Sequence, residues 1–253
     1  MRRVLMVTPH FPPDSSAAAH RVRLLAPHLP GAGWTPTIVT VDPSAYEGRL
    51  DRDLEALVPS GLQIVRAPVW RSGMTRWVGL GDLGLRAFTG LRHACRQLLA
   101  RERFDALFIT IYPVYPALLG PALKAEFGVP FVLDYQDPWV NATPRKQRTE
   151  FQSSFKYRIN QRLARLLEPR VIAKSAGIVS VSPQYCAEVA ERYPRANARC
   201  VVLPFAPSGE DFAAAAELLL SKYPQYRAMG LSREQGTMIR ITPQRVLRWQ
   251  YAS

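Results

Sequence analysis

Residues 131–140 have the sequence FVLDYQDPWV, in which a short apolar run leads directly into two carboxylates and a Pro-Trp pair. Such a run, bounded by turn residues, is typical of a strand buried on both faces of a parallel sheet. Comparable runs occur at 4–8, 36–41, 62–69, 106–111, 177–181 and 200–203. Segments with helical periodicity separate them. This alternation predicts a single Rossmann-like, doubly wound α/β domain with a mostly parallel sheet over residues 1–206.

The helices expected between these strands differ in how clearly the sequence marks them. Residues 83–101 carry apolar side chains at helical spacing along their whole length. A helix over 16–29 should kink or end at Pro27, because proline lacks the backbone N–H that an interior position donates. Further helices are expected at 117–127, which Gly120 and Pro121 interrupt, and at 148–168.

Polar and aromatic side chains follow three of the expected strands, at the point where each strand ends. They are His10, Asp14, Tyr112, Tyr115, Asp134, Asp137 and Trp139. In open α/β sheets, ligands bind outside the carboxyl ends of the strands, so these side chains are candidates for one binding edge. Two carboxylates beside an aromatic ring suit a general base or the binding of sugar hydroxyls. In the alternative interpretation, the aspartates cap a turn and the tryptophan packs.

The loop after the first strand, PHFPPDSSAAAHRVR, lacks the G-x-G-x-x-G pattern of a dinucleotide site. Its small residues at 15–19 lead into a helix whose free backbone N–H groups suit an anion. His20, Arg21 and Arg23 lie in the first turns of that helix. We interpret the loop as facing a ligand; the alternative is a proline-rich loop with solvated charges.

The formal net charge of +13 is concentrated in part of the chain. Residues 144–174 hold nine Lys/Arg against two Asp/Glu. The helix expected at 148–168 has an apolar stripe and, on other faces, four basic residues. The stripe is Phe151, Phe155, Ile159, Leu163 and Leu166, and the basic residues are Lys156, Arg158, Arg162 and Arg165. Either the stripe packs on the sheet, or the helix lies on an anionic membrane surface.

Several classes of site are not supported by the sequence. P-loop, H-E-x-x-H and G-x-S-x-G motifs are absent, and no nucleic-acid-binding module is recognisable. The histidines and carboxylates show no metal-ligand spacing, so no metal is expected. Cys95, Cys186 and Cys200 are widely spaced and are predicted to be buried, unpaired thiols. The amino-terminal apolar run is too short for a signal peptide, so we expect a cytoplasmic protein.

Taken in order, six segments resemble the amino-terminal half of a family 4-type glycosyltransferase of the GT-B architecture. They are VLMVTPHFPPDSSAAAHRVRLLAPHL, GWTPTIVTVDP, FDALFITIYP, GVPFVLDYQDPWV, AGIVSVSP and VVLPF. In that family an amino-terminal domain mainly holds the acceptor, and a second Rossmann-like domain holds the nucleotide-sugar. The resemblance implies a nucleotide-sugar as co-substrate, no other cofactor and no metal.

The resemblance also implies roles for individual residues. His10, Asp14, His20 and Arg21 would line the cleft from the first loop, and Tyr112 lies on the same rim. Asp134, Asp137 and Trp139 would face the acceptor. The acceptor would be a polysaccharide or glycolipid precursor, and one version of this hypothesis has it linked to a lipid. Asp137 is the candidate general base and His20 is its competitor.

The family would continue beyond residue 206 into a second domain, whereas residues 207–253 show no strand–helix alternation. We therefore expect an acceptor-side domain followed by a helical or irregular tail, with a separate donor domain as a partner. Two alternatives remain. The chain is either a non-catalytic module, which binds a partner or the inner face of the membrane, or a truncated, inactive fragment.

Overall fold

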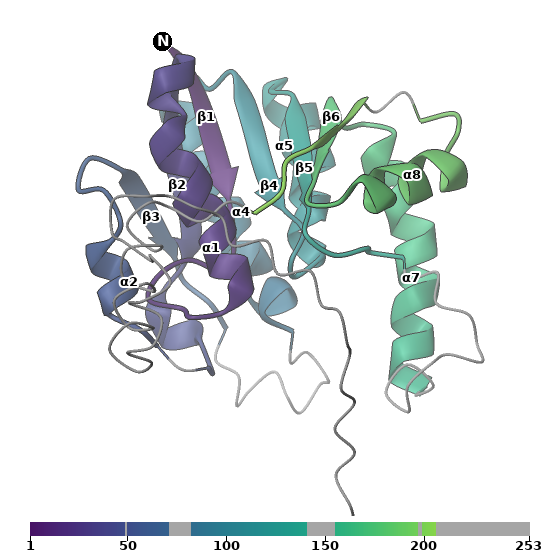
Figure 1. Cartoon of the computed structure of the whole chain (residues 1–253), viewed down its shortest axis with the longest axis horizontal. Helices are drawn as coiled ribbons and strands as arrows, with labels where there is room; N and C mark the ends of the chain where they lie inside the picture. Colours follow the sequence, from purple (N-terminus) through teal and green to yellow (C-terminus); the bar gives the residue numbers. More distant parts are fainter. Residues whose placement is uncertain (49, 71–81, 141–154, 197–198, 206–253) are drawn as a thin grey trace, which may run out of the picture. The chain divides into compact units, whose positions relative to one another are not determined.

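The computed structural model describes residues 1–48, 50–70, 82–140, 155–196 and 199–205, without the side chains of 155–157 (Figure 1). Within these residues seven strands form one sheet, in which all neighbours are parallel, in the order β3-β2-β1-β4-β5-β6-β7. The strands are β1 (Arg2–Val7), β2 (Trp34–Val41), β3 (Gln63–Ala67), β4 (Ala106–Thr110), β5 (Phe131–Tyr135), β6 (Gly177–Ser180) and β7 (Arg199–Val202). The predicted doubly wound fold is confirmed.

Helices cover both faces of this sheet. The α-helices are α1 (Ala17–Leu25), α2 (Asp53–Ala56), α4 (Leu83–Arg101), α5 (Leu119–Phe127), α7 (Phe155–Ile172) and α8 (Pro183–Arg192). Short 3-10 turns are η1 (Ala26–His28), η2 (Pro30–Ala32), η3 (Pro43–Ala45) and η4 (Tyr115–Leu118). Helix α4 has the predicted bounds, and the Asp82 side chain caps it by accepting the N–H of Leu85 at 3.1 Å. Helix α1 ends just before Pro27, as expected.

The side chains of β1 show how the sheet builds two cores. Leu5 and Val7 belong to the larger cluster, whereas Val4 and Met6 belong to the smaller one, which also holds Val22 of α1. Alternate residues of a strand point to opposite faces, so a strand covered on both sides needs apolar residues throughout. This explains the continuous apolar runs in the sequence.

Two glycines let helices approach the strands closely. A Cβ at Gly90 of α4 would lie 2.0 Å from the carbonyl oxygen of Pro68, and one at Gly120 of α5 would lie 2.5 Å from the ring of Phe131. Both distances are shorter than any van der Waals contact, so a larger residue would force the helix away. The interruption of the expected helix at Gly120 is therefore a packing feature.

Of the two interpretations of the apolar stripe, packing on the sheet does not hold for the part of the stripe that the structure describes. The exposed fractions of Ile159, Leu163 and Leu166 are 41%, 41% and 51%. The side that faces the protein instead carries Ala164, Glu168, Val171 and Ile172, which are at most 2% exposed. Phe151 lies outside the described residues, and so does the side chain of Phe155.

The prediction of three unpaired thiols is also wrong. Cys186 of α8 and Cys200 of β7 form a disulfide with a Cα–Cα distance of 5.8 Å, whereas Cys95 is free and buried. The two cysteines are 14 residues apart. They meet only because β7 returns to the sheet beside the start of α8, which their spacing does not reveal.

The described residues up to Phe205 form one compact unit. The tail predicted at 207–253 lies outside the described residues. No helix within the described residues has the length and apolar character that crossing a membrane requires.

Candidate active site

The order of the strands reverses between β1 and β4, so the loops that follow these two strands diverge to opposite sides. In doubly wound sheets this switch point is where ligands bind, outside the carboxyl ends of the strands. His10 follows β1, and Tyr112 follows β4. The ring centroids of these two residues are 5.9 Å apart, and the ring of Tyr46, which follows β2, lies 6.1 Å from that of His10. Three loops thus converge on His10.

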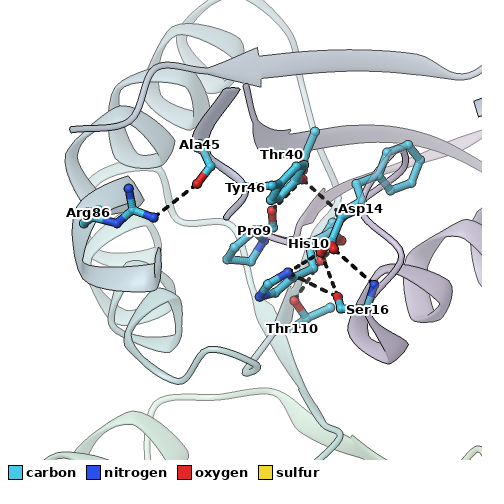
Figure 2. Close-up of polar contacts among 11 residues, drawn as sticks. Pro9, His10, Asp14, Ser16, Thr40, Ala45, Tyr46, Arg86 and Thr110 are labelled. Carbon is cyan, nitrogen blue, oxygen red and sulfur yellow. Dashed lines mark hydrogen bonds and ion pairs between the residues drawn. The ribbon is translucent and has the colours of Figure 1, made fainter. Parts of the chain in front are cut away.

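His10 and Asp14 form a pair at this edge (Figure 2). The Nδ1 atom of His10 is 2.5 Å from Oδ2 of Asp14, and the side chains are 17% and 7% exposed. Ser16 donates from its hydroxyl to the same Asp14 oxygen at 2.7 Å and from its backbone N–H to the other oxygen at 3.0 Å. The Asp14 carboxylate is therefore fixed from two directions.

Hydrogen bonds from neighbouring elements hold the loop that carries His10. The Tyr46 hydroxyl donates to the Pro9 carbonyl at 3.0 Å and accepts the Phe11 N–H at 3.1 Å. The Thr8 hydroxyl donates to the carbonyl of His10 at 2.9 Å. The loop is thus pinned on both sides of the histidine, which orients the imidazole without a ligand.

Helix α4 supports this arrangement from the side. Its buried Arg86 donates from Nη2 to the carbonyl of Ala45 at 3.1 Å, which holds η3 and the adjacent Tyr46 in place (Figure 2). Asp82, at the start of the same helix, lies close enough to His10 that a protonated imidazole would lower the pKa of the Asp82 carboxyl. Burial raises the pKa of Asp82, and the N–H groups at the helix start partly offset this.

The chemistry of the pair follows from the state of Asp14. Burial alone would raise its pKa, but the hydrogen bonds from His10 and Ser16 outweigh this, and the pKa of the Asp14 carboxyl is lowered. An ionised Asp14 accepts the Nδ1–H of His10, which leaves the lone pair on Nε2. In this tautomer the pair has the arrangement that a general base requires.

A second ion pair lies beneath the rim and is closed to ligands. The guanidinium of Arg21 contacts Oδ1 of Asp134 through Nε at 2.9 Å and Nη2 at 2.8 Å. The two side chains are 4% and 0% exposed. Arg21 Nη1 donates to the Leu203 carbonyl at 2.8 Å. Burial raises the pKa of Asp134, which Arg21 opposes. In this geometry both residues connect α1, β5 and the chain after β7, and neither is open to an acceptor.

Trp139, Asp137 and His20 were predicted for the same edge, and each has its own surroundings. Trp139 is 4% exposed and belongs to the larger core, which agrees with the alternative interpretation that it simply packs. Asp137 is an exposed residue, although part of its side chain is buried. This partial burial raises the pKa of its carboxyl. Its charge acts on Tyr185 at the start of α8. His20 is half-buried on α1, where its Nδ1 lies 3.1 Å from Nη2 of Arg23.

The sequence interpretation missed Tyr46, Asp82 and Arg86. Tyr46 comes shortly after the second strand, and the rule that sites follow strand ends would have included it. Asp82 precedes the periodic segment at 83, which is the position of a helix cap. Arg86 lies within that helix and carries no such signal. No three His, Cys, Asp or Glu side chains in the part of the chain that the structure describes could hold a metal ion.

A parallel seven-stranded sheet with helices on both faces defines a Rossmann-like α/β domain, and the His10–Asp14 pair lies at its switch point. The family model of the glycosyl transferase 4-like domain matches residues 16–206, and the chain belongs to this family. The resemblance to family 4-type glycosyltransferases is thereby confirmed. No curated protein gave a significant match.

Solved structures with a similar fold are GT-B glycosyltransferases. Phytolacca americana UGT2, complexed with UDP-2fluoro-glucose and pterostilbene, is similar with a TM-score of 0.56 and 11% identity over 86% of this chain. A ugt transferase from Siraitia grosvenorii in complex with UDP has a TM-score of 0.53 and 11% identity over 88% of this chain. The chain covers 57% and 56% of these two structures. At this identity, the likeness shows the fold alone.

Proposed function

We propose that this chain is the acceptor-side domain of a glycosyltransferase. When completed by a donor domain, it transfers a hexosyl group from a nucleotide-sugar to a hydroxyl of a polysaccharide or glycolipid precursor. Membership of the glycosyl transferase 4-like family supports this, and so do similar folds that hold UDP or UDP-2fluoro-glucose. The observation that carries the proposal is the His10–Asp14 pair at the switch point of the sheet.

In this mechanism His10 is the base that activates the acceptor. The acceptor hydroxyl oxygen forms a bond to the anomeric carbon of the donor sugar while the bond from that carbon to the nucleoside diphosphate breaks. The hydroxyl proton passes to Nε2 of His10, and the ionised Asp14 stabilises the resulting imidazolium. The rings of Tyr46 and Tyr112 border the position that the acceptor would occupy. The nucleoside diphosphate leaves without this proton, which stays on His10.

Asp137 and His20 remain competing hypotheses for the base. The raised pKa of Asp137 makes its carboxylate a better proton acceptor than an ordinary aspartate, but its sequence position places it after β5 instead of at the switch point. The contact of His20 with Arg23 occupies one of its ring nitrogens. We favour His10, because the fixed Asp14 carboxylate holds its Nδ1 and leaves Nε2 to accept a proton.

The test combines transfer and binding, both measured on the full chain. Nucleotide release and glycan mass are followed with UDP- and GDP-sugars and a panel of oligosaccharide acceptors, and saturation-transfer NMR reports acceptor binding. Under conditions in which the wild-type chain supports transfer, His10→Gln should lower transfer by about 100-fold or more and leave acceptor binding within about twofold. Asp137→Asn and His20→Gln are the matched comparisons.

The outcomes separate the role of His10 from the proposed function. Transfer that survives His10→Gln but is lost in Asp137→Asn would move the base to Asp137. Acceptor binding without transfer would support the acceptor-side assignment and favour a separate donor domain. Neither binding nor transfer with any acceptor would contradict the proposed function, and would favour the alternative of a non-catalytic module.

A further inference from the structure

One side of α7 presents apolar and basic side chains to solvent. We call this surface the α7 face, and its members are Arg158, Ile159, Arg162, Leu163, Arg165 and Leu166, all of which are exposed. Lys156 was predicted to belong to the same surface, but its side chain lies outside the described part of the chain. Leucine and isoleucine that are scattered singly need no explanation, whereas three in a row along one helix form a patch.

The exposure of this face is fixed by polar contacts on the opposite side of the helix. Glu168 is fully buried and accepts hydrogen bonds from the hydroxyls of Tyr135 at 3.0 Å and Tyr193 at 2.6 Å. Arg192 lies 3.3 Å from the same carboxylate. A rotation of α7 that buried Leu163 and Leu166 would move Glu168 out of this cluster and leave two tyrosine hydroxyls without their acceptor.

The charge of the face has one sign. Between residues 155 and 174, Glu168 is the only acidic residue, and it points inward. Within the described residues, no carboxylate forms an ion pair with Arg158, Arg162 or Arg165. The exposed Arg170 and Lys174 continue the basic character toward the end of the helix. By helical spacing, Ile159, Leu163 and Leu166 form a central row with arginines beside it.

We propose that the α7 face binds the surface of an anionic membrane. The arginines pair with lipid phosphates, and the central apolar row enters the boundary between headgroups and acyl chains. The apolar row distinguishes this partner from a nucleic acid, whose backbone would contact only the arginines. An ordinary apolar protein partner would leave the positive charges of Arg158, Arg162 and Arg165 without compensation.

The connection through α7 places this face relative to the candidate active site. Helix α7 follows β5 and precedes β6, and these strands are parallel neighbours, so the helix starts at the carboxyl edge of the sheet and runs back. Figure 1 shows its first turns extending past the ends of the strands. The membrane proposal itself does not depend on glycosyl transfer.

Vesicle co-sedimentation of the full chain tests the proposal. Phosphatidylcholine vesicles with phosphatidylglycerol should bind the chain, those of phosphatidylcholine alone should not, and added salt should weaken binding. A variant with Arg158→Glu, Arg162→Glu and Arg165→Glu should lose affinity by about 100-fold, because each basic residue near such a surface contributes about fivefold. A variant with Ile159→Ser, Leu163→Ser and Leu166→Ser should lose at least tenfold at unchanged charge.

The control changes the same number of charges elsewhere. Arg92→Glu, Arg101→Glu and Arg103→Glu alter exposed arginines in or just after α4. This control has the same net charge as the α7 arginine variant, and it should bind vesicles within about threefold of wild type. Circular dichroism checks that all variants are folded. Equal losses in both arginine variants would reduce the effect to net charge and overturn the proposal. Undiminished binding of the serine variant, or stronger binding to RNA than to vesicles, would overturn it as well.

Discussion

The buried ion pair between Arg21 and Asp134 gives the sharpest test of how this fold is held together. The Asp134 carboxyl is fully buried, and Arg21 contacts it at 2.8 and 2.9 Å. Removing one partner leaves an uncompensated charge in the interior, which costs about 3–5 kcal/mol. Arg21→Met should therefore lower the free energy of unfolding by this amount and the melting temperature by about 6–20 °C.

The double variant Arg21→Met/Asp134→Leu isolates the electrostatic part. It leaves no buried charge, so we expect it to be more stable than Arg21→Met by about 2 kcal/mol or more. Part of the cost should remain, because Arg21 also donates to the carbonyl of Leu203 at 2.8 Å and its guanidinium lies 5.3 Å from the ring of Phe205. Urea unfolding followed by tryptophan fluorescence and circular dichroism measures the wild type, Arg21→Met, Asp134→Leu and the double variant, which together complete the cycle.

The pH dependence of Arg21→Met has a defined sign. Burial raises the pKa of Asp134, and loss of the guanidinium should raise it further. A carboxyl whose pKa is raised on folding destabilises the protein as the pH rises through the folded-state pKa. Arg21→Met should thus be closest to wild type in acid and fall behind toward neutral pH. A cost below about 1 kcal/mol, or strictly additive effects in the cycle, would refute a buried, coupled pair.

Three further perturbations test separate features. Gly90→Ala should lower stability by about 1–3 kcal/mol, because its Cβ would lie 2.0 Å from the backbone oxygen of Pro68; calorimetry measures this, and a neutral change would contradict the close approach of α4. Asp14→Asn should lower the free energy of unfolding by about 1–3 kcal/mol at neutral pH. The pKa of Asp14 lies below its ordinary value of 3.8, so the stabilisation by the ionised carboxylate should be lost as the pH falls through the folded-state pKa. Urea unfolding at several pH values measures this loss. Reducing the Cys186–Cys200 disulfide, which closes a loop with a separation of 14, should cost about 3 kcal/mol, and thiol titration of the unfolded chain should count one thiol before reduction and three afterwards.

The placement of the elements shows what local sequence contributes. The helix at 83–101 and the strand at 106–110 were predictable almost to the residue, because apolar periodicity, the Asp82 cap and a continuous buried run are local features. The position of the candidate active site at the strand ends was also predictable, since parallel strands bring the residues that follow them to one edge. The identity of its central pair was not, because His10 and Asp14 were only two among several polar residues there.

The sequence by itself determined the alternation of strands and helices, and with it the doubly wound sheet and the edge where polar residues gather. Tertiary structure alone decided which side chains meet. Arg21 and Asp134 are 113 residues apart, and no local pattern joins them. The same holds for the side on which α7 packs: its periodicity offered an apolar stripe, but the buried Glu168 cluster fixes the rotation of the helix. Periodicity sets a helix's amphipathic faces, whereas only its partners determine which face is buried.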